Sequence, residues 1–174
     1  RPLLKAAADH HHDHEHEVDY LYKTLIDTQA SADYLAAQAK VHTSRQTYPQ
    51  STFGKDLKQI AELITADTDT RIYYLSLSGF DTHVNQKGKQ ERLLKQYADG
   101  IHAFVSDLQQ HGLMKDVSIL TFSEFGRRVK QNASGGTDHG TANNLFVIGE
   151  QLAAPGIFNS APDLSQLDQG DLIY

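Results

Sequence analysis

The stretch "RIYYLSLSGF", residues 71–80, is rich in aliphatic, aromatic and β-branched residues and follows the polar segment "TADTDT". This composition predicts a β-strand, with Gly79 as the break at its end. A helical pattern follows over residues 89–111, and "DVSILTFS", residues 116–123, predicts a second strand. A strand, a long helix and a strand form a crossover unit, which implies parallel strands joined by a right-handed connection. The sequence therefore predicts an α/β fold.

Further elements surround this unit. Apolar residues fall on one helical face from Val18 to Ala39, and again at three- and four-residue steps from Phe53 to Ile64. "NLFVIG", residues 144–149, predicts a third strand. A strand of six residues spans about 20 Å. A parallel third strand would therefore place the preceding loop at the edge of the sheet opposite the carboxyl ends of the first two strands. We therefore expect a mostly parallel sheet whose third strand is antiparallel or crosses steeply.

Composition narrows the classes of function. The 174 residues suffice for one domain, and 39% hydrophobic and 22% charged residues are typical of a globular protein. A net charge of −6 without a Lys/Arg cluster argues against a nucleic-acid partner. The lack of cysteine excludes disulfides and thiolate chemistry, and no apolar run reaches the length of a membrane span. Because the chain begins without Met and ends abruptly, we expect a piece of a longer protein.

The segment "DHHHDHEHE", residues 9–17, holds five of the ten histidines and four carboxylates. Such a tract can bind transition metals. We favour the simpler interpretation of a solvated, acidic helix start or a disordered lead-in. The predicted organisation is a lead-in over residues 1–17 and one domain over residues 18–174.

Polar signatures follow both strands of the crossover unit: the first ends in "GFDTH" and the second in "SEFGRR". In parallel sheets the carboxyl ends of the strands share one edge, where ligands bind. Asp81, His83 and Glu124 are therefore expected to converge. Carboxylate and imidazole ligands suit zinc, manganese or iron, whereas carboxylates with water suit calcium or magnesium. Taken singly, each residue has a structural alternative as a turn cap, a loop residue or a helix cap.

The loop "GGTDHGT" adds Asp138 and His139. We expect His139 to be a ligand, while Asp138 either lies behind the ligands or forms a turn. Arg127 beside a metal would suit a phosphate or sulfate group, although Arg127 and Arg128 also fit a solvated basic pair. Ser123 lies in "FSEFG", which is not a nucleophile elbow, so a serine hydrolase is disfavoured.

Four motifs, "GFDTHVNQ", "DVSILTFSEFGRR", "GGTDHGTANNLFVIG" and "PDLSQLDQGDL", occur in this order. They resemble the carboxyl-terminal half of the domain-of-unknown-function family fifteen-oh-one. The resemblance runs from about residue 48 to residue 174 and leaves out the histidine-rich segment. Proteins of that family are bacterial, generally carry a twin-arginine export signal, and are grouped with the alkaline phosphatase and sulfatase superfamily. The resemblance implies an alkaline-phosphatase-like α/β/α sandwich, a periplasmic or secreted location, and a metal-dependent site for phosphate or sulfate esters.

The resemblance also implies roles for particular positions. Asp81 and His83 match the early Asp…His pair of the superfamily, and His139 matches its final histidine. Glu124 stands where Asp is usual, and Phe125 where His is usual. The superfamily's amino-terminal half, which supplies a further Asp and the nucleophile, is not among these residues. We therefore expect an incomplete domain with either a one-metal site or a non-catalytic relic.

These observations lead to a first hypothesis: a metal-dependent hydrolase of small anionic phosphate or sulfate esters, whose cofactor is a divalent ion such as zinc, manganese or calcium. The alternatives are a non-catalytic exported binding or surface-associated module on the same fold, and a purely structural domain. In the first hypothesis Arg127 assists with the anion. The residues assigned to the metal are Asp81, His83, Glu124, Asp138 and His139.

Overall fold

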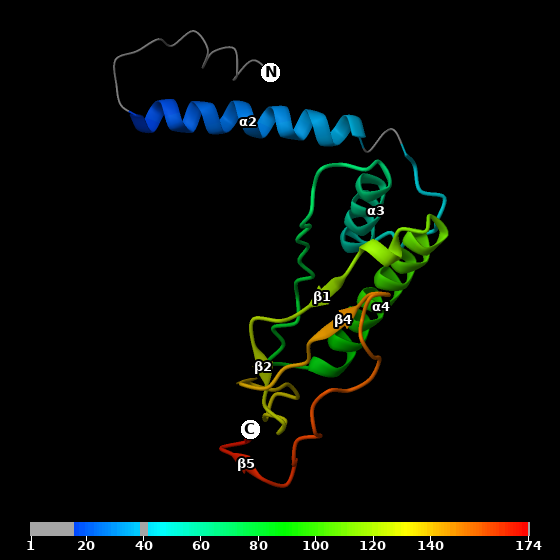
Figure 1. Ribbon diagram of the computed structural model, residues 1–174. Helices are drawn as coiled ribbons and strands as arrows, with labels where there is room; N and C mark the ends of the chain where they lie inside the picture. The colour runs from blue at the N-terminus through cyan, green and yellow to red at the C-terminus, as the bar shows by residue number, and fades with distance from the viewer. Residues whose placement is uncertain (1–15, 39–41, 174) are drawn as a thin grey trace. The chain divides into compact units, whose positions relative to one another are not determined.

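The computed structural model describes residues 16–38 and 42–173 (Figure 1). The chain divides into two units, residues 1–43 and residues 44–174. The first unit contains helix α2 (His16–Gln38), which confirms the helix predicted from Val18 onward. The predicted lead-in over residues 1–17 lies outside the described residues, except for the two with which α2 begins. In the described ranges, no helix combines the length and the apolar character needed to cross a membrane.

The second unit is built on helices α3 (Thr52–Thr65) and α4 (Gln86–Gln110), which confirm the predicted helices. Helix α3 begins at Ser51, whose hydroxyl accepts a hydrogen bond from the Gly54 backbone at 3.1 Å. Apolar residues at helical spacing on both helices pack together into one core. The buried members of this core are Tyr48, Phe53, Leu57, Ala61, Ile101, Ala103, Phe104, Leu108 and Met114.

Residues 71–80 lie against this core, but no strand is assigned to them. Their burial alternates: Leu75 and Leu77 pack on the core, whereas Ile72 and Tyr74 are 86% and 74% exposed. The prediction is therefore wrong in that residues 71–80 form no hydrogen-bonded strand. The alternating pattern reflects packing on the helices, whereas a strand also needs a hydrogen-bonded neighbour. The described part of the chain provides none for this segment.

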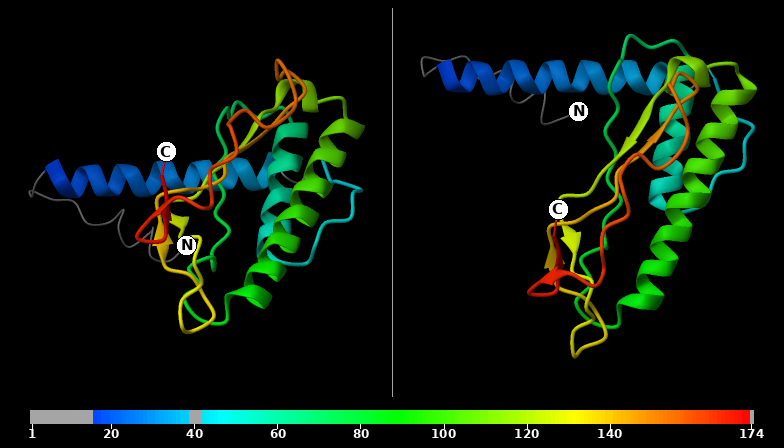
Figure 2. Two further views of the ribbon diagram at one scale, coloured as in Figure 1. Left: turned by 90° about the horizontal axis from the view of Figure 1, so that it is seen from below. Right: turned by 60° about the horizontal axis from the view of Figure 1, so that its bottom comes forward.

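Strand β1 (Ile119–Thr121) pairs with β4 (Phe146–Ile148) in antiparallel register, with Leu120 opposite Val147. This confirms that the third predicted strand is antiparallel to the second. Figures 1 and 2 show residues 71–80 and β1 running in the same direction, with α4 between them in the chain. The direction expected of a crossover unit is therefore present, but the predicted mostly parallel sheet is not. The described residues form antiparallel two-stranded sheets beside the helices.

Two further pairs and one short helix were not predicted. Strand β2 (Gly126–Arg127) pairs with β3 (His139–Gly140), and β5 (Leu167–Asp168) pairs with β6 (Asp171–Leu172). A 3₁₀ helix, η1 (Met114–Asp116), leads into β1. The β2–β3 pair closes the glycine-rich loop between its strands, and this closure brings the loop to the carboxyl end of residues 71–80.

Candidate metal centre

Three exposed side chains from two separate segments meet beyond the end of residues 71–80. Asp81 and His83 directly follow this extended segment, and His139 lies on β3. An isolated bridge between Val84 and Gly135 joins the two segments. Antiparallel pairing of His139 with Arg127 fixes the second segment from its other side. The structure therefore brings together three residues that lie up to 58 positions apart in the sequence.

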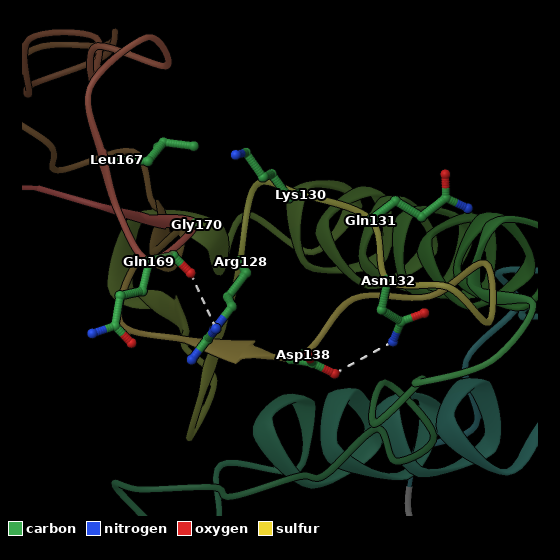
Figure 3. Close-up of a pocket in the computed structure, with 8 residues that line it drawn as sticks. All are labelled: Arg128, Lys130, Gln131, Asn132, Asp138, Leu167, Gln169 and Gly170. Carbon is green, nitrogen blue, oxygen red and sulfur yellow. Dashed lines mark hydrogen bonds between the residues drawn. The ribbon is translucent and has the colours of Figure 1, made fainter.

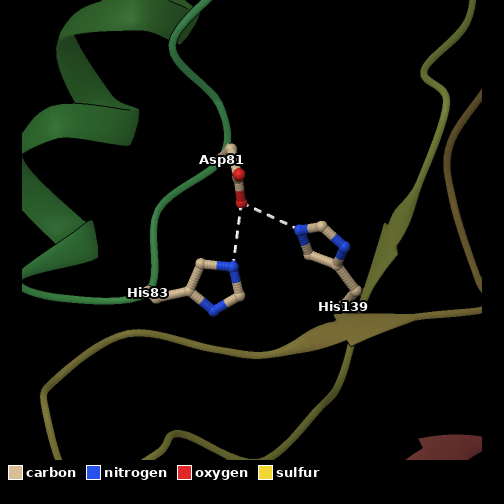
Figure 4. A group of neighbouring side chains, drawn as sticks. All are labelled: Asp81, His83 and His139. Carbon is tan, nitrogen blue, oxygen red and sulfur yellow. Dashed lines mark hydrogen bonds and ion pairs between the residues drawn. The ribbon is translucent and has the colours of Figure 1, made fainter.

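One carboxylate oxygen lies between two imidazoles (Figure 4). Asp81 Oδ1 is 2.9 Å from His83 Nε2 and 2.8 Å from His139 Nε2. The two rings lie 5.0 Å apart between centroids, at an angle of 35°. One ligand atom from each of the three residues lies within 4.8 Å of the other two. We call Asp81, His83 and His139 the Asp-His-His cluster.

The pKa of Asp81 is lowered from its ordinary value. The main cause is the hydrogen bond with His139. Desolvation opposes it, and the charges of His139 and His83 lower the pKa further. Because the Asp81 side chain is 61% exposed, this shift carries little folding energy. Its consequence is chemical: the carboxylate stays ionised, as a metal ligand must be.

Asn132 organises the loop that carries His139. Its Oδ1 accepts hydrogen bonds from the backbone of Ser134 at 2.9 Å and of Gly136 at 3.0 Å, which closes a tight turn. Its Nδ2 donates to the His83 carbonyl at 3.0 Å and to Asp138 Oδ1 at 3.3 Å. One amide group therefore shapes the turn and also ties it to the segment of Asp81 and His83.

Asp138 lies behind His83. Its Oδ1 is 3.4 Å from His83 Nδ1, while the opposite ring nitrogen, Nε2, faces Asp81. Hydrogen bonds, first with Asn132 and then with His83, lower the pKa of Asp138. A carboxylate on the far nitrogen of a histidine orients the ring and fixes its tautomer. Of the two roles expected for Asp138, the geometry favours the position behind a ligand, outside the three-residue cluster.

Gly136 allows the loop to approach His83 closely. A Cβ atom added at this position would lie 2.3 Å from both the carbonyl carbon and the carbonyl oxygen of His83. No side chain fits at that distance, so only glycine permits this approach. The second glycine of the "GG" in the loop motif is thus explained by packing against the candidate site.

Phe125 supports the ring of His139. The two rings are stacked, with centroids 4.2 Å apart and 10° between their planes. On Phe125, the guanidinium carbon of Arg127 lies 5.0 Å from the ring centroid. The aromatic residue that follows Glu124 therefore fixes the orientation of the His139 ring.

Arg127 lies beside the cluster, where it binds backbone oxygens. Its Nη1 donates to the Thr137 carbonyl at 2.7 Å and its Nη2 to the Phe80 carbonyl at 2.5 Å, and Nη2 is 3.6 Å from Asp81 Oδ1. The side chain is only 17% exposed. Arg127 thus joins the ends of the two segments that carry the cluster and places a positive charge next to Asp81.

Glu124 lies outside the cluster and is exposed. Its neighbour Phe125 makes the contact with His139 instead. The sequence predicts Glu124 as a ligand and does not indicate the supporting contacts of Phe125, Asn132 and Gly136. An Asn followed by "ASGG" is typical of a side-chain-closed turn, and this signal could have identified Asn132.

The ligand atoms of the cluster fit a transition metal. Two imidazoles and one carboxylate form the ligand set of several catalytic zinc sites and of mononuclear iron sites, which keep a position open for substrate. Calcium prefers six or more oxygen ligands, so zinc or iron suits this cluster better. In a tetrahedral zinc site neighbouring ligand atoms lie roughly 3.4 Å apart. The two separations between Asp81 Oδ1 and the histidine Nε2 atoms, 2.9 Å and 2.8 Å, lie within about 0.6 Å of that spacing.

Comparison with known proteins identifies a family but no function. The sequence profile of a family described as "Protein of unknown function (DUF1501)" matches residues 7–168. This match begins well before the expected start at residue 48 and includes the whole histidine-rich segment, residues 9–17. No curated protein and no solved structure matches the chain.

Proposed function

We propose that this chain, which belongs to the DUF1501 family of proteins of unknown function, binds one divalent metal ion through Asp81, His83 and His139 and acts in the hydrolysis of phosphate or sulfate esters. The observation that carries the proposal is the position of Asp81 Oδ1, 2.9 Å and 2.8 Å from the Nε2 atoms of His83 and His139 on an exposed surface. Zinc and iron fit these ligand atoms best.

The residues around the cluster have separate tasks in this proposal. Asp138 holds the ring of His83 through Nδ1, and Phe125 holds the ring of His139 by stacking. Arg127 keeps the two segments together and adds positive charge beside the position of the ester anion. A bound divalent ion supplies Lewis-acid stabilisation of charge on the transferred group.

A non-catalytic binding module remains the second candidate, and one observation favours it. The hydroxyl groups nearest the cluster in sequence are engaged locally: Thr82 binds the Phe80 carbonyl at 3.2 Å, and Thr137 binds Gln86 Oε1 at 3.1 Å. Thr82 is also only 3% exposed. Neither Thr82 nor Thr137 therefore offers the free, exposed hydroxyl group that a nucleophile needs.

Relationship to the alkaline phosphatase and sulfatase superfamily, and a periplasmic or secreted location, are parts of the same proposal. The motif resemblance supports both, and the common direction of residues 71–80 and β1 agrees with the expected crossover. Fractionation of cells that express the full-length protein tests the location. Recovery in the periplasm or the medium is expected, and exclusive recovery in the cytoplasm contradicts this part.

Metal titration followed by an ester assay tests the main proposal. Wild type should bind one more equivalent of zinc than Asp81→Ala or His139→Ala, because the histidine-rich segment contributes equally to all three proteins. Glu124→Ala is the control and should match wild type, since Glu124 lies outside the cluster. Hydrolysis of p-nitrophenyl phosphate or sulfate by wild type and by Glu124→Ala, without hydrolysis by Asp81→Ala or His139→Ala, supports the enzyme. Equal zinc binding by all variants contradicts the cluster, and zinc binding without turnover of any ester favours the binding module.

A further inference from the structure

A pocket of about 310 Å³ adjoins the Asp-His-His cluster (Figure 3). Its walls are the segment after β2, Asp138, and the turn between β5 and β6. It is lined mainly by charged and amide side chains, with one apolar residue. The lining residues are Arg128, Lys130, Gln131, Asn132, Asp138, Leu167, Gln169 and Gly170.

The pocket and the cluster share one wall. Asp138 lines the pocket, and its Oδ1 is also 3.4 Å from His83 Nδ1. Arg128, on the other side, binds the segment of the cluster twice: its backbone donates to the Asp138 carbonyl at 3.0 Å and its Nε to the His139 carbonyl at 3.2 Å. A ligand bound at the cluster therefore has this pocket as its immediate neighbour.

The guanidinium of Arg128 is preorganised, and neither cation of the pocket forms an ion pair within the described residues. Arg128 Nη1 donates to the Gln169 carbonyl at 3.1 Å, so two carbonyl oxygens fix its guanidinium. Within residues 16–38 and 42–173, no carboxylate lies within ion-pair distance of Arg128 or Lys130. The single carboxylate of the lining, Asp138, is engaged by Asn132 and His83. The pocket is therefore lined by two cations and one carboxylate, in a protein whose net charge is −6.

We infer that this pocket binds a second phosphate or sulfate group of the ligand whose first ester group lies at the cluster. A fixed guanidinium, an ammonium and the amide side chains of Gln131 and Gln169 are donors of the kinds that recognise tetrahedral oxyanions. The substrate class is thus an ester that carries two such groups. The bridging role rests on the proposed function, whereas the binding of an anion in the pocket does not.

The first test uses the full chain, stripped of metal, at pH 8 and constant ionic strength, with inorganic phosphate as the probe in an NMR titration. Lys130→Gln should weaken phosphate binding roughly threefold or more, and Arg128→Gln should weaken it further. Lys130 makes no side-chain hydrogen bond in the described structure, so its variant keeps the fold. The matched control Lys115→Gln, which removes an exposed charge on η1, should bind phosphate as wild type does. Wild-type affinity in both pocket variants overturns the inference.

The second test separates the inference from the proposed function. Asp81→Ala should lose the bound zinc yet keep phosphate binding in the pocket, because Asp81 does not line it. In zinc-loaded wild type, fructose 1,6-bisphosphate should bind roughly tenfold more tightly than fructose 6-phosphate. Lys130→Gln should lose most of this preference. A metal site without any preference for the bisphosphate overturns the bridging role, and phosphate binding without a metal site overturns only the proposed function.

Discussion

The ring of Phe125 lies on the ring of His139, with centroids 4.2 Å apart and 10° between their planes. Phe125 directly precedes β2 and His139 lies on β3, so the pairing of these two strands and the stacking of the two rings stabilise each other. Two consequences follow for the cluster. His139 presents Nε2 toward Asp81, and the position after Glu124 supports a ligand instead of being one.

Replacing Phe125 tests this support directly. Phe125→Leu keeps an apolar side chain but removes the stacked ring, which leaves the His139 imidazole free to rotate. We expect zinc affinity to fall roughly three- to tenfold, because a stacked aromatic pair contributes about 0.5–1.5 kcal/mol. Calorimetric titration measures the change. Phe125→Tyr keeps the ring and should retain the wild-type affinity; an unchanged affinity in Phe125→Leu contradicts the supporting role.

Gly136→Ala should disturb both the fold and the cluster. The new Cβ would lie 2.3 Å from the His83 carbonyl, so the loop must move away from His83. We expect a loss of about 1–3 kcal/mol in the free energy of unfolding, together with weaker zinc binding. Gly88→Ala is the control. Its added Cβ meets only the end of the Arg92 side chain, at 3.8 Å, and alanine favours the helix. Equal stability of the two variants, measured by urea unfolding, speaks against the close approach.

The pKa of Asp81 reports the hydrogen bond from His139. In the folded protein this pKa is lowered, so the associated stability is present above the ordinary Asp value near 3.9 and is lost as the pH falls through the lowered value. Without metal, His139→Ala should move the Asp81 titration upward in pH, as followed by carboxyl ¹³C NMR. Asp163, whose pKa is lowered by a hydrogen bond with Ser165, is the internal control. A titration of Asp81 that stays in place in the variant refutes the hydrogen bond.

Tyr48 should make the core sensitive to alkali. Its hydroxyl donates to Asp107 Oδ2 at 2.8 Å, and burial, followed by this hydrogen bond, raises its pKa. Unfolded tyrosine loses its proton near pH 10, whereas the folded one keeps it. The free energy of unfolding therefore holds below about pH 10 and falls above it.

Tyr48→Phe tests this dependence. The variant should lose about 1–2 kcal/mol at pH 8, because the Asp107 carboxylate loses a hydrogen bond. It should also show a shallower fall in stability between pH 10 and 11. Urea unfolding across this range gives both numbers. Tyr74→Phe, at a 74% exposed position, should keep the wild-type slope. A slope in Tyr48→Phe as steep as in wild type contradicts the assignment.

The helices could be predicted because their signals are local, and the antiparallel strand because of the edge of the sheet at which its preceding loop has to lie. The apolar spacing of α3 and α4 and the position of the loop before β4 are visible in the sequence. Residues 71–80 show what the sequence pattern cannot predict. Their alternating burial follows from the sequence, but a β-strand also needs a hydrogen-bonded neighbouring strand, which the alternation of apolar residues does not reveal. The β2–β3 and β5–β6 pairs are only two residues long in each strand, which is too short for a periodic signal.

The residues of the site likewise divide into those that the sequence predicts and those that it does not. Asp81, His83 and His139 could be named because each adjoins the end of a predicted element. Glu124 met the same criterion and lies outside the cluster. The ring of Phe125 and the amide of Asn132 act through stacking and loop closure, which no spacing rule encodes. The pocket at Arg128 depends on the turn of residues 167–170, about 40 positions away.

Anomalous diffraction from crystals grown with zinc tests the central claim most directly, because it locates the metal independently of the histidine-rich segment. We predict a peak at about 2.0–2.2 Å from the carboxylate of Asp81 and from the Nε2 atoms of His83 and His139. Asp138 should stay on Nδ1 of His83, behind that ligand. A fully occupied zinc elsewhere, with the Asp-His-His cluster empty in the same crystal, would contradict the account.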